Sequence, residues 1–541
     1  MNLAAPSNNL PTAADAIAPP VSIPALMFDA ARRHAGRAVI EEAGVRIDYA
    51  ELPALALGVS RALMACGINR GDRVAIWASN CADWIIAALG VQCAGGVMVP
   101  INTRMKGVEA ADVLERSGTR LLFVQAEFLG TDYLALLEPH RPSSLERLVV
   151  LGDAQPGRDT DMGWAQFIAS GQSVSEAQAS ERAATLGADD LCDLLFTSGT
   201  TGKPKGVMSG HGQNLQAFSE FVKVLGLVPG DRYLIVNPFF HAFGYKAGWL
   251  TCLLAGATIL PHPVFDAEAV FQRIAAERIS VLPGPPTLYL SMLAHPRLAT
   301  TDLSSLRVAV TGAATIPPIL IERMRNELGF SVVTTAYGLT ECGGLATICN
   351  PSDPAQIIAG TSGRAIPGTE VSIRDSDNQE LTAGESGEIC LRGFHVMQGY
   401  FENPDATAEA IDADGWLHTG DVGDLDQQGN LRITDRLKDM FIVGGFNCYP
   451  AEIEAGLIEH PAIAQVAVIG VPDERMGEVG CACVVLRAES SLDEAGLISW
   501  ARERMANYKV PRLVRFFDAL PVNASNKVAK NELRALVVIS Q

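Results

Sequence analysis

Short apolar runs that end in glycine or proline turns recur along this chain and alternate with helix-like segments. The runs "GDRVAIWAS" from Gly71, "RLLFVQA" from Arg120, "ISVLPGPP" from Ile279 and "LRVAVTGAA" from Leu306 are examples. Apolar strands without polar alternation are buried on both faces, as in parallel sheets that helices cover. The pattern therefore predicts an α/β fold of largely parallel strands, with helices such as one over 49–67 packed on them.

The chain is too long for one compact core, and the pattern of its predicted strands, helices and turns changes along its length. At 541 residues, two or more domains are expected. A loose tail over 1–22 precedes a large multi-layer α/β domain over 23–435. Within that domain, short strands and polar turns from Gly363 to Leu391 predict a β-rich subdomain. A small α+β domain over 436–541 follows, and the join near 435–438 should be short and hinge-like.

Charge and cysteine usage exclude several classes of protein. A net charge of -19 argues against a broad surface for nucleic acid or anionic lipid. The 11 scattered cysteines include no CxxC pair, so neither a zinc site nor a disulfide framework is expected, and free thiols favour the cytoplasm. The longest apolar stretch, from Trp84 to Pro100, is too short and too interrupted for an integral membrane span. It predicts a buried helix that turns into a buried strand.

The stretch "FTSGTTGKPKGV", Phe196 to Val207, follows an apolar run and is rich in groups that bind phosphate. It is not a Walker A loop, because Thr197 and Pro204 stand where that loop needs a glycine and a hydroxyl. Hydroxyls, glycine amides and a lysine can nonetheless surround an anion. The residues that would do so are Thr197, Ser198, Gly199, Thr200, Thr201, Gly202 and Lys203. From residue chemistry alone, an ordinary polar hairpin remains the alternative.

Eight motifs in one order resemble the adenylate-forming enzymes, which include acyl-CoA synthetases, peptide-synthetase adenylation domains and firefly luciferase. After "FTSGTTGKPKG" come "NPFFHAFG" from Asn237, "TGAAT" from Thr311, "YGLTE" from Tyr337, "GWLHTGD" from Gly415, "ITDRLKDM" from Ile433, "GGFNCYPAEIE" from Gly444 and "NASNKV" from Asn523. The resemblance spans residue 23 to the C-terminus. It implies that a carboxylate attacks the α-phosphate of ATP in the presence of Mg²⁺. The thiol of coenzyme A then displaces AMP from the acyl-adenylate.

The resemblance also implies a nucleotide site whose residue types fit this chemistry. The stretch from Thr197 to Gly206 would hold the β- and γ-phosphates, Glu341 would bind Mg²⁺, and Thr340 would lie beside the α-phosphate. A carboxylate suits a hard cation, although Glu341 taken alone would more simply be an acid at a helix N-terminus. The remaining contacts would be Tyr337 on adenine, Gly312, Ala313 and Ala314 as the wall beside it, and Asp421 and Arg436 on the ribose hydroxyls.

The C-terminal domain would supply the catalytic lysine. Lys527 would reach the carboxylate and the α-phosphate, with Lys530 as the alternative. Asn526 stands where the family usually has glycine before the lysine, and asparagine tolerates left-handed backbone geometry, so function should survive. Lys438 at the hinge would let the domain rotate between the two half-reactions. The pantetheine arm of coenzyme A would then pass Gly444, Gly445 and Phe446.

Two residues bear on which acid is used. His241, in "FFHAFG", would lie between the adenylate and the acyl pocket. Lys246 stands in an otherwise apolar helix, "GYKAGWLTCLLAG", that should line this pocket, and a buried cation needs a partner. It would either reach solvent along its stem or bind a ketone or second carboxylate of the acid. Together with "VLPGPPT" and "VTGAAT", this segment most closely resembles ligases of bacterial steroid breakdown that activate a bicyclic diketo-propanoate.

Other functions stay open at this stage. A ligase for medium- or long-chain fatty acids or aryl acids would share the nucleotide motifs. A fatty acyl–AMP ligase would carry an insertion near the domain junction, for which "RLKDMFIVGGFNCYP" has no room. A nucleotide-sensing module without catalysis would be expected to lack Lys527 or Glu341. The expected partners are a small carboxylic acid and, as an open alternative, a second copy of the chain in a homodimer.

Overall fold

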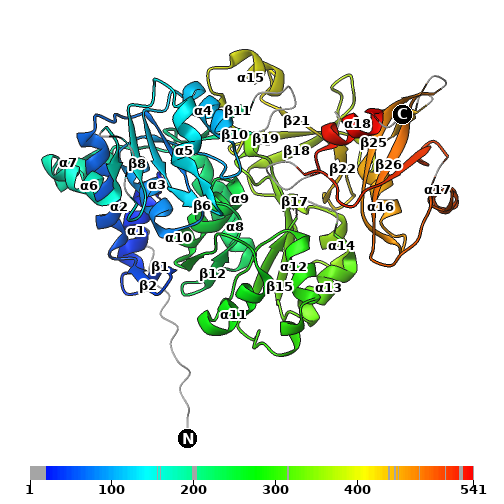
Figure 1. Cartoon of the computed structure of the whole chain (residues 1–541), viewed down its shortest axis with the longest axis horizontal. Helices are drawn as coiled ribbons and strands as arrows, with labels where there is room; N and C mark the ends of the chain where they lie inside the picture. The colour runs from blue at the N-terminus through cyan, green and yellow to red at the C-terminus, as the bar shows by residue number, and fades with distance from the viewer. Residues whose placement is uncertain are drawn as a thin grey trace, which may run out of the picture.

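The protein is built from stacked sheets and helices, and the α/β fold class is confirmed (Figure 1). The computed structural model describes residues 20–154, 156, 158, 160–197, 204–312, 316–436, 439–443, 446–448, 450–473, 476–505, 507–522 and 528–539. The first helix, α1 (Ile23–Arg33), begins where the loose tail is expected to end. Ser22 caps it, since its hydroxyl accepts a hydrogen bond from the Ala25 N–H at 3.3 Å.

An eight-stranded sheet carries the phosphate-loop stretch near one edge. Its order is β20-β11-β10-β4-β3-β5-β8-β9; the six strands from β10 to β9 pair in parallel, and β11 and β20 pair antiparallel. The strands are β3 (Arg73–Trp77), β4 (Val97–Pro100), β5 (Leu121–Val124), β8 (Arg147–Val150), β9 (Met162–Gly163), β10 (Leu191–Thr197), β11 (Lys205–Gly210) and β20 (Gly399–Tyr400). Strands β4 and β5 are buried throughout, as the continuous apolar runs predict.

Helices separate these strands along the chain. The helix-to-strand stretch expected over 84–100 is confirmed as α3 (Ala82–Cys93) followed by β4. The other elements of this part are α2 (Leu52–Ala65), α4 (Gly107–Arg116), the hairpin β6 (Glu127–Phe128) and β7 (Thr131–Asp132), α5 (Tyr133–Leu137), η2 (Glu138–His140), α6 (Trp164–Ser170), η3 (Gly171–Ser173), α7 (Glu176–Ala184) and α8 (His211–Leu225).

A second layer consists of two four-stranded halves that meet at one residue. The first half is β12 (Arg232–Ile235), β13 (Thr258–Pro261), β1 (Ala38–Glu42) and β2 (Val45–Asp48); the second is β14 (Val308–Thr311), β15 (Val332–Tyr337), β16 (Thr347–Ile348) and β17 (Arg364–Ala365). Val281 bridges to Tyr233 and Val308 and so links the halves. The strand expected at "ISVL" is therefore reduced to this bridge residue and backbone hydrogen bonds beside it, such as that from the Leu282 N–H to the Val308 carbonyl at 3.0 Å. Pro283 and Pro285 lack the N–H groups that a regular, longer ladder requires.

The helices of the second layer include one with π-helical geometry. They are α9 (Ala242–Gly244), the π-helical segment η4 (Tyr245–Leu250), α10 (Thr251–Ala255), α11 (Ala267–Glu277), α12 (Pro286–Leu293), η5 (Pro296–Ala299), α13 (Pro318–Asn326), η6 (Thr340–Cys342) and α14 (Ala355–Gly360). The elements α9, η4 and α10 follow one another without a break, and they carry His241 at their start.

A β-rich part and a small α+β part complete the chain. The first is an antiparallel sheet of β18 (Thr369–Arg374), β19 (Gly387–Gly393), β21 (Leu417–Leu425) and β22 (Leu431–Arg436), with α15 (Pro404–Ala410). The second is a sheet of β24 (Phe446–Cys448), β23 (Phe441–Val443), β26 (Gly477–Leu486), β25 (Ile463–Asp473) and β27 (Leu513–Phe516), with α16 (Pro450–Leu457), α17 (Glu494–Arg502) and α18 (Lys530–Ile539). Figure 1 shows β25, β26, α16 and α17 gathered at one end of the molecule. The expected domain bounds stay predictions.

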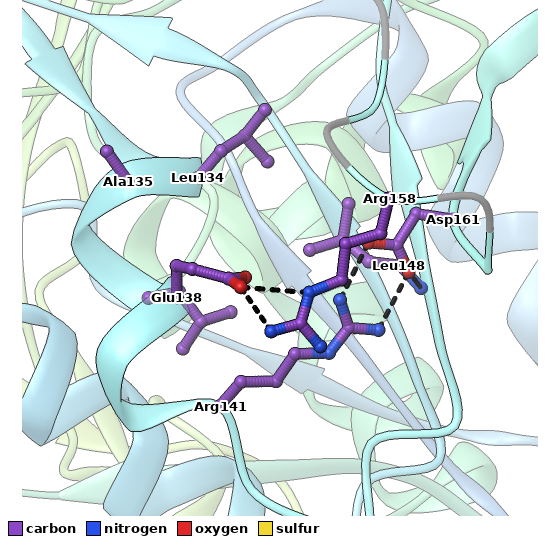
Figure 2. Close-up of a pocket in the computed structure, with 8 residues that line it drawn as sticks. Leu134, Ala135, Glu138, Arg141, Leu148, Arg158 and Asp161 are labelled. Carbon is purple, nitrogen blue, oxygen red and sulfur yellow. Dashed lines mark hydrogen bonds and ion pairs between the residues drawn. The ribbon is translucent and has the colours of Figure 1, made fainter.

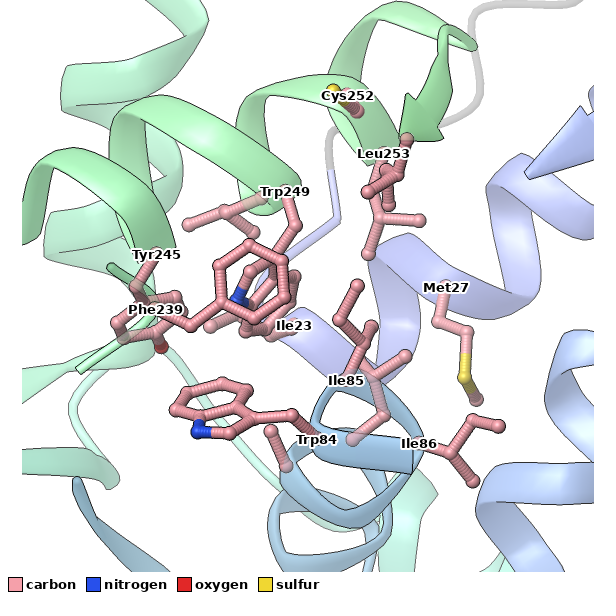
Figure 3. Packing of buried hydrophobic residues seen from close by; sticks show 14 of the residues in the cluster. Ile23, Met27, Trp84, Ile85, Ile86, Phe239, Tyr245, Trp249, Cys252 and Leu253 are labelled. Carbon is pink, nitrogen blue, oxygen red and sulfur yellow. The ribbon is translucent and has the colours of Figure 1, made fainter. Parts of the chain in front are cut away.

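An aromatic core holds the segment after His241 against the first layer (Figure 3). The ring of Trp84 on α3 lies 5.4 Å from that of Phe239 and 6.2 Å from that of Trp249, measured between centroids. Tyr245 stacks on Trp249 at 4.7 Å. All four side chains are fully buried, and aromatic pairs at such separations stabilise beyond their area alone. The η4 segment is thus fixed in position on its core side.

Acidification is expected to weaken the fold through His211. Its ring is buried at the start of α8, and its Nδ1 accepts a hydrogen bond from the Ile23 N–H at 3.3 Å. Burial lowers the pKa of this histidine from 6.5 to about 4, against the opposing charge of Asp190. The unfolded chain protonates near pH 6.5, so the stability that the neutral ring provides is complete above that pH and is lost towards pH 4. The slope is at most about 1.4 kcal/mol per pH unit for one such histidine.

Thermal melting across this pH range checks the prediction. His211→Asn keeps an acceptor oxygen near the position of Nδ1 but cannot titrate, so its melting temperature should fall less steeply than that of the wild type. His140→Asn, at an exposed position, is the matched control and should follow the wild type. A pH slope that is unchanged in His211→Asn would contradict the assignment of this effect to His211.

Candidate active site

The strands β10 and β11 form a hairpin that flanks the predicted phosphate loop. At its described end, Phe196 pairs with Gly206 and Thr197 with Lys205. The Lys205 ammonium lies 4.9 Å from the centre of the Tyr400 ring, within the range of a cation–π interaction. The predicted phosphate contacts of Ser198, Gly199, Thr200, Thr201, Gly202 and Lys203 lie outside the described residues.

Glu341 lies against the end of this hairpin. It belongs to the single turn η6, which ends at Gly343 (φ +69°) and Gly344 (φ +99°), where a left-handed backbone favours glycine. Its Oε1 accepts hydrogen bonds from the Tyr400 hydroxyl at 3.0 Å and from the Thr197 hydroxyl at 3.4 Å. The fold thus brings together Thr197 and Glu341, which are 144 positions apart in sequence. Thr340, directly before Glu341, is half-buried in the same turn.

Tyr400 is a site residue that sequence reasoning missed. It ends β20 and is nearly buried; burial, together with the Glu341 carboxylate, raises the pKa of its phenol. The protonated hydroxyl donates to Glu341 and so orients the carboxylate. The sequence signal is weak: an aromatic residue follows Gly399 in "QGYFENP", and only tertiary contacts single it out.

The carboxylate of Glu341 fits a hard cation. Its Oε1 is engaged by two hydroxyls, whereas Oε2 carries no hydrogen bond from a described residue, and the side chain is half-buried. Mg²⁺ takes carboxylate and hydroxyl oxygens and keeps waters and substrate phosphates as its other ligands. Glu341, with Thr197 beside it, would therefore hold the metal, and this role stays a prediction.

Tyr337, the last residue of β15, contacts Asp421 within β21. The Tyr337 hydroxyl donates to Asp421 Oδ2 at 2.7 Å, both side chains are buried, and burial with the Asp421 charge raises the pKa of Tyr337. Arg436 is the β22 partner of Asp421, and its side chain is not described. Gly312 directly follows β14, which runs parallel to β15, so the carboxyl ends of both strands bring Gly312 and Tyr337 to one edge. Ala313 and Ala314 lie outside the described residues.

Glu388 of β19, also missed from the sequence, holds the turn that precedes Asp421. Its Oε1 accepts the Gly420 N–H at 3.0 Å, and its Oε2 lies 2.8 Å from Nδ1 of His418. The Asp421 N–H in turn donates to the Thr419 hydroxyl at 3.1 Å. One carboxylate thus fixes both sides of the turn, which sets the direction of the Asp421 side chain.

His241 caps the short helix α9 and lies near the Glu341 turn. Its Nδ1 accepts the Phe243 N–H at 3.4 Å, and its side chain is exposed. A Cβ added at Gly344 would lie 3.0 Å from the Cβ of Ala242, so the two segments are in contact. The fold therefore places His241, Glu341 and Thr197, from three distant parts of the chain, in one region.

Lys246 is neither at the surface nor without a charge partner. It is fully buried, so the alternative in which it reaches solvent along its stem is wrong. Its Nζ lies 3.1 Å from the Ser209 hydroxyl and 3.3 Å from Asp193 Oδ1. A polar contact with the acid stays a prediction, while the structure supplies a protein carboxylate for the ammonium.

The remaining predicted residues are in the C-terminal part. Lys438, Gly444, Gly445 and Lys527 lie outside the described residues, and Phe446 begins β24 with an undescribed side chain. The alternative lysine, Lys530, forms an ion pair with Glu454 at 2.8 Å. That pair ties α18 to α16, so Lys530 already has a structural partner within its own domain.

A pocket of about 270 Å³ contains none of the predicted residues (Figure 2). Its charges are paired: Arg141 forms a twofold hydrogen bond with Asp161 at 2.6 and 2.7 Å, and Arg158 pairs with Glu138. With both guanidinium groups neutralised by carboxylates, this pocket offers no excess charge to a ligand. Among the helices that the structure describes, none combines the length and apolarity needed to cross a membrane.

Comparison with known proteins identifies relatives over nearly the whole chain. The family model described as AMP-binding enzyme matches residues 27–401, and the one described as AMP-binding enzyme C-terminal domain matches residues 452–527. A 3-[(3aS,4S,7aS)-7a-methyl-1,5-dioxo-octahydro-1H-inden-4-yl]propanoyl:CoA ligase of Mycobacterium tuberculosis is 50% identical over 491 residues, covering 91% of this chain and 94% of that protein.

Two further relatives match this chain over nearly the full length of both proteins. The protein of the same name from Rhodococcus jostii is 47% identical over 522 residues, covering 95% of this chain and 98% of its own. A solved structure, the anthranilate CoA ligase AuaEII in complex with anthranoyl-AMP, matches with a TM-score of 0.84 at 27% identity and covers 97% of this chain and 99% of that one.

Proposed function

The chain belongs to the family of AMP-binding enzymes and is an acid–CoA ligase, and on this premise we propose that its acid is a hydrophobic bicyclic propanoate carrying two ring ketones. The observation that supports this substrate is the 50% and 47% identity, over more than nine-tenths of the chain, to two ligases named for the 7a-methyl-1,5-dioxo-octahydro-indenyl propanoyl group. The acid would come from the breakdown of steroids.

The reaction has two half-reactions. In the first, a carboxylate oxygen of the acid attacks the α-phosphorus of ATP, the bond to the bridging oxygen of the β-phosphate breaks, and pyrophosphate leaves. In the second, the sulfur of coenzyme A attacks the acyl carbon, the bond from that carbon to the AMP oxygen breaks, and the thiol proton is released. Two anions approach each other in the first step, so cations and hydrogen-bond donors must face them.

The described residues would act mainly by positioning ATP and its metal ion. Thr197 would contact the phosphates, and Glu341, oriented by Tyr400, would hold Mg²⁺, which supplies positive charge when bound. Tyr337 fixes Asp421, whose carboxylate would then accept hydrogen bonds from the ribose hydroxyls. Lys527 would reach the reacting oxygens from the C-terminal domain.

Two observations support a hydrophobic acid. The segment that starts at His241 continues through α9, η4 and α10 with almost entirely apolar side chains. Phe243, two residues after His241, is only partly buried and packs against the main hydrophobic core. Apolar walls with few polar groups are typical of sites that bind such molecules.

Location and assembly complete the proposal. All 11 cysteines are free thiols, which supports a cytoplasmic location. A homodimer stays a prediction from the sequence, to be tested by light scattering on the eluting protein. The thiol substrate is coenzyme A rather than a carrier protein, since both relatives are CoA ligases.

A panel of acids tests the proposed substrate. With ATP and coenzyme A, kcat/KM for the diketo ring acid should exceed that for an unbranched fatty acid of equal carbon number on the order of 100-fold, because a site that hydrogen-bonds the two ketones would leave its polar groups unpaired with the fatty acid. The same ring acid without ketones is the matched control, since it separates the contribution of the ketones from that of shape. Equal or better turnover of the fatty acid, or of an aryl acid, would assign the enzyme to those classes.

A further inference from the structure

A buried polar cluster lies behind the site and none of its residues has a role in the reaction described above. Lys246, the second residue of η4, Asp193 on β10 and Ser209 on β11 all have side chains with no exposure to solvent. The ammonium of Lys246 contacts Asp193 Oδ1 at 3.3 Å and the Ser209 hydroxyl at 3.1 Å. One cation carried by η4 therefore contacts two neighbouring strands.

The two partners of Lys246 occupy equivalent places on the hairpin. Asp193 and Ser209 face each other in the register of β10 and β11. β10 leads into the predicted phosphate loop, and β11 leads out of it. The ammonium thus connects both strands of the hairpin to the helical segment that begins at His241. In the same segment, Tyr245 and Trp249 pack into the aromatic core (Figure 3).

The cluster extends to the turn that carries Glu341. The second oxygen of Asp193 accepts hydrogen bonds from Asn214 Nδ2 at 2.9 Å and from the Cys192 thiol at 3.1 Å. A Cβ added at Gly343 would lie 3.8 Å from Oδ1 of Asn214, so this side chain is next to the end of η6. A continuous set of buried contacts therefore runs from Lys246 through Asp193 and Asn214 to the Glu341 turn.

Stability alone does not explain a charge pair at this position. Removing two opposite charges from water is costly, and apolar residues of similar volume often stabilise a core as well or better. A fully buried ion pair whose members also hydrogen-bond to their neighbours adds geometric definition, since its members accept few other arrangements. A cation that holds two strands and a helix in one arrangement is such a device.

We propose that Lys246 is a positioning residue, whose ammonium clamps the β10–β11 hairpin to the helix that begins at His241 and thereby sets the phosphate-binding strands relative to the acid-binding side. This inference rests on the proposed function, because it concerns where ATP and the acid meet. Lys246 acts through Asp193 and Ser209 and does not touch the reacting atoms.

A charge-removal series tests the clamp. Lys246→Met should lower the melting temperature, because it leaves the buried Asp193 carboxylate without its cation. The double variant Lys246→Met with Asp193→Asn removes both charges and should recover much of that loss. Its Kd for ATP, measured without acid, should nevertheless stay raised on the order of tenfold, because small misplacements of binding groups far from the chemistry are strongly felt.

Two further variants keep the test decisive. Ser209→Ala deletes one hydroxyl, is expected to fold, and should raise the Kd for ATP less than the double variant does. Lys223→Met is the matched control, since that lysine is 68% exposed on α8 and pairs with Glu220; it should bind ATP as the wild type does.

The outcomes separate three roles for Lys246. Recovery of both melting temperature and Kd for ATP in the double variant would make the pair purely structural, and a wild-type Kd in Ser209→Ala would likewise contradict the clamp. A defect confined to acids with ketones, with ATP binding intact, would make Lys246 a substrate contact. Wild-type enzyme that releases no pyrophosphate with any acid would instead overturn the proposed function, a result distinct from any difference among the variants.

Discussion

Lys527→Ala should lower acid-dependent release of pyrophosphate by on the order of 1,000-fold, while thioester formation from supplied acyl-adenylate continues near the wild-type rate. The first half-reaction brings a carboxylate against an α-phosphate, and the lysine would neutralise the charge that builds up on their oxygens. The second half-reaction releases AMP without that encounter of two anions. Isotope exchange between pyrophosphate and ATP measures the first step, and coenzyme A capture of synthetic acyl-adenylate measures the second.

Two other lysines supply the controls. Lys530→Ala should retain the first half-reaction, because Lys530 is already paired with Glu454 at 2.8 Å. Lys438→Pro should show the opposite pattern to Lys527→Ala, with adenylate formed and thioester formation lost, since a proline at the hinge restricts the rotation. Near-normal exchange in Lys527→Ala together with a severe loss in Lys530→Ala would transfer the catalytic role to Lys530.

Glu341→Gln should raise the Mg²⁺ concentration needed for half-maximal activity about tenfold or more and lower kcat on the order of 100-fold. Glutamine keeps the size of the side chain and can still accept the hydrogen bonds from Tyr400 and Thr197. The negative charge that would hold the cation is lost. Calorimetric titration of ATP with and without Mg²⁺ should show that the metal no longer strengthens ATP binding in this variant.

Tyr400→Phe should raise the Mg²⁺ requirement as well, but by less than Glu341→Gln does. It removes one hydrogen bond that orients the Glu341 carboxylate and keeps the charge, so the shift in Mg²⁺ requirement should go in the same direction and be smaller. Glu327→Gln is the matched control, because Glu327 is exposed and pairs with Arg323 in α13. A wild-type Mg²⁺ requirement in Glu341→Gln would place the metal elsewhere.

Local pattern was enough for the fold class and for the central strands β3, β4 and β5 of the first layer. Continuous apolar runs such as 121–124 predict buried parallel strands, because side chains of such a strand must be covered on both faces. The same reasoning gave too regular a strand at "ISVL", where Val281 alone bridges to both neighbouring strands and prolines follow it closely. Tyr400 and Glu388 were missed because nothing in their local sequence distinguishes them; their roles depend on partners 59 and 30 positions away.

The sequence by itself determined the family, the order of the motifs and the chemical types of the nucleotide-binding residues, because these are properties of short contiguous stretches. Tertiary structure alone decided the surroundings of Lys246. The sequence shows a cation in an apolar helix and leaves its partner open, since the carboxylate that pairs with it, Asp193, lies more than fifty positions earlier on a strand. Charges in a low-dielectric interior are stabilised by whatever the fold places within a few ångströms, and that distance is set by the packing of sheet and helix.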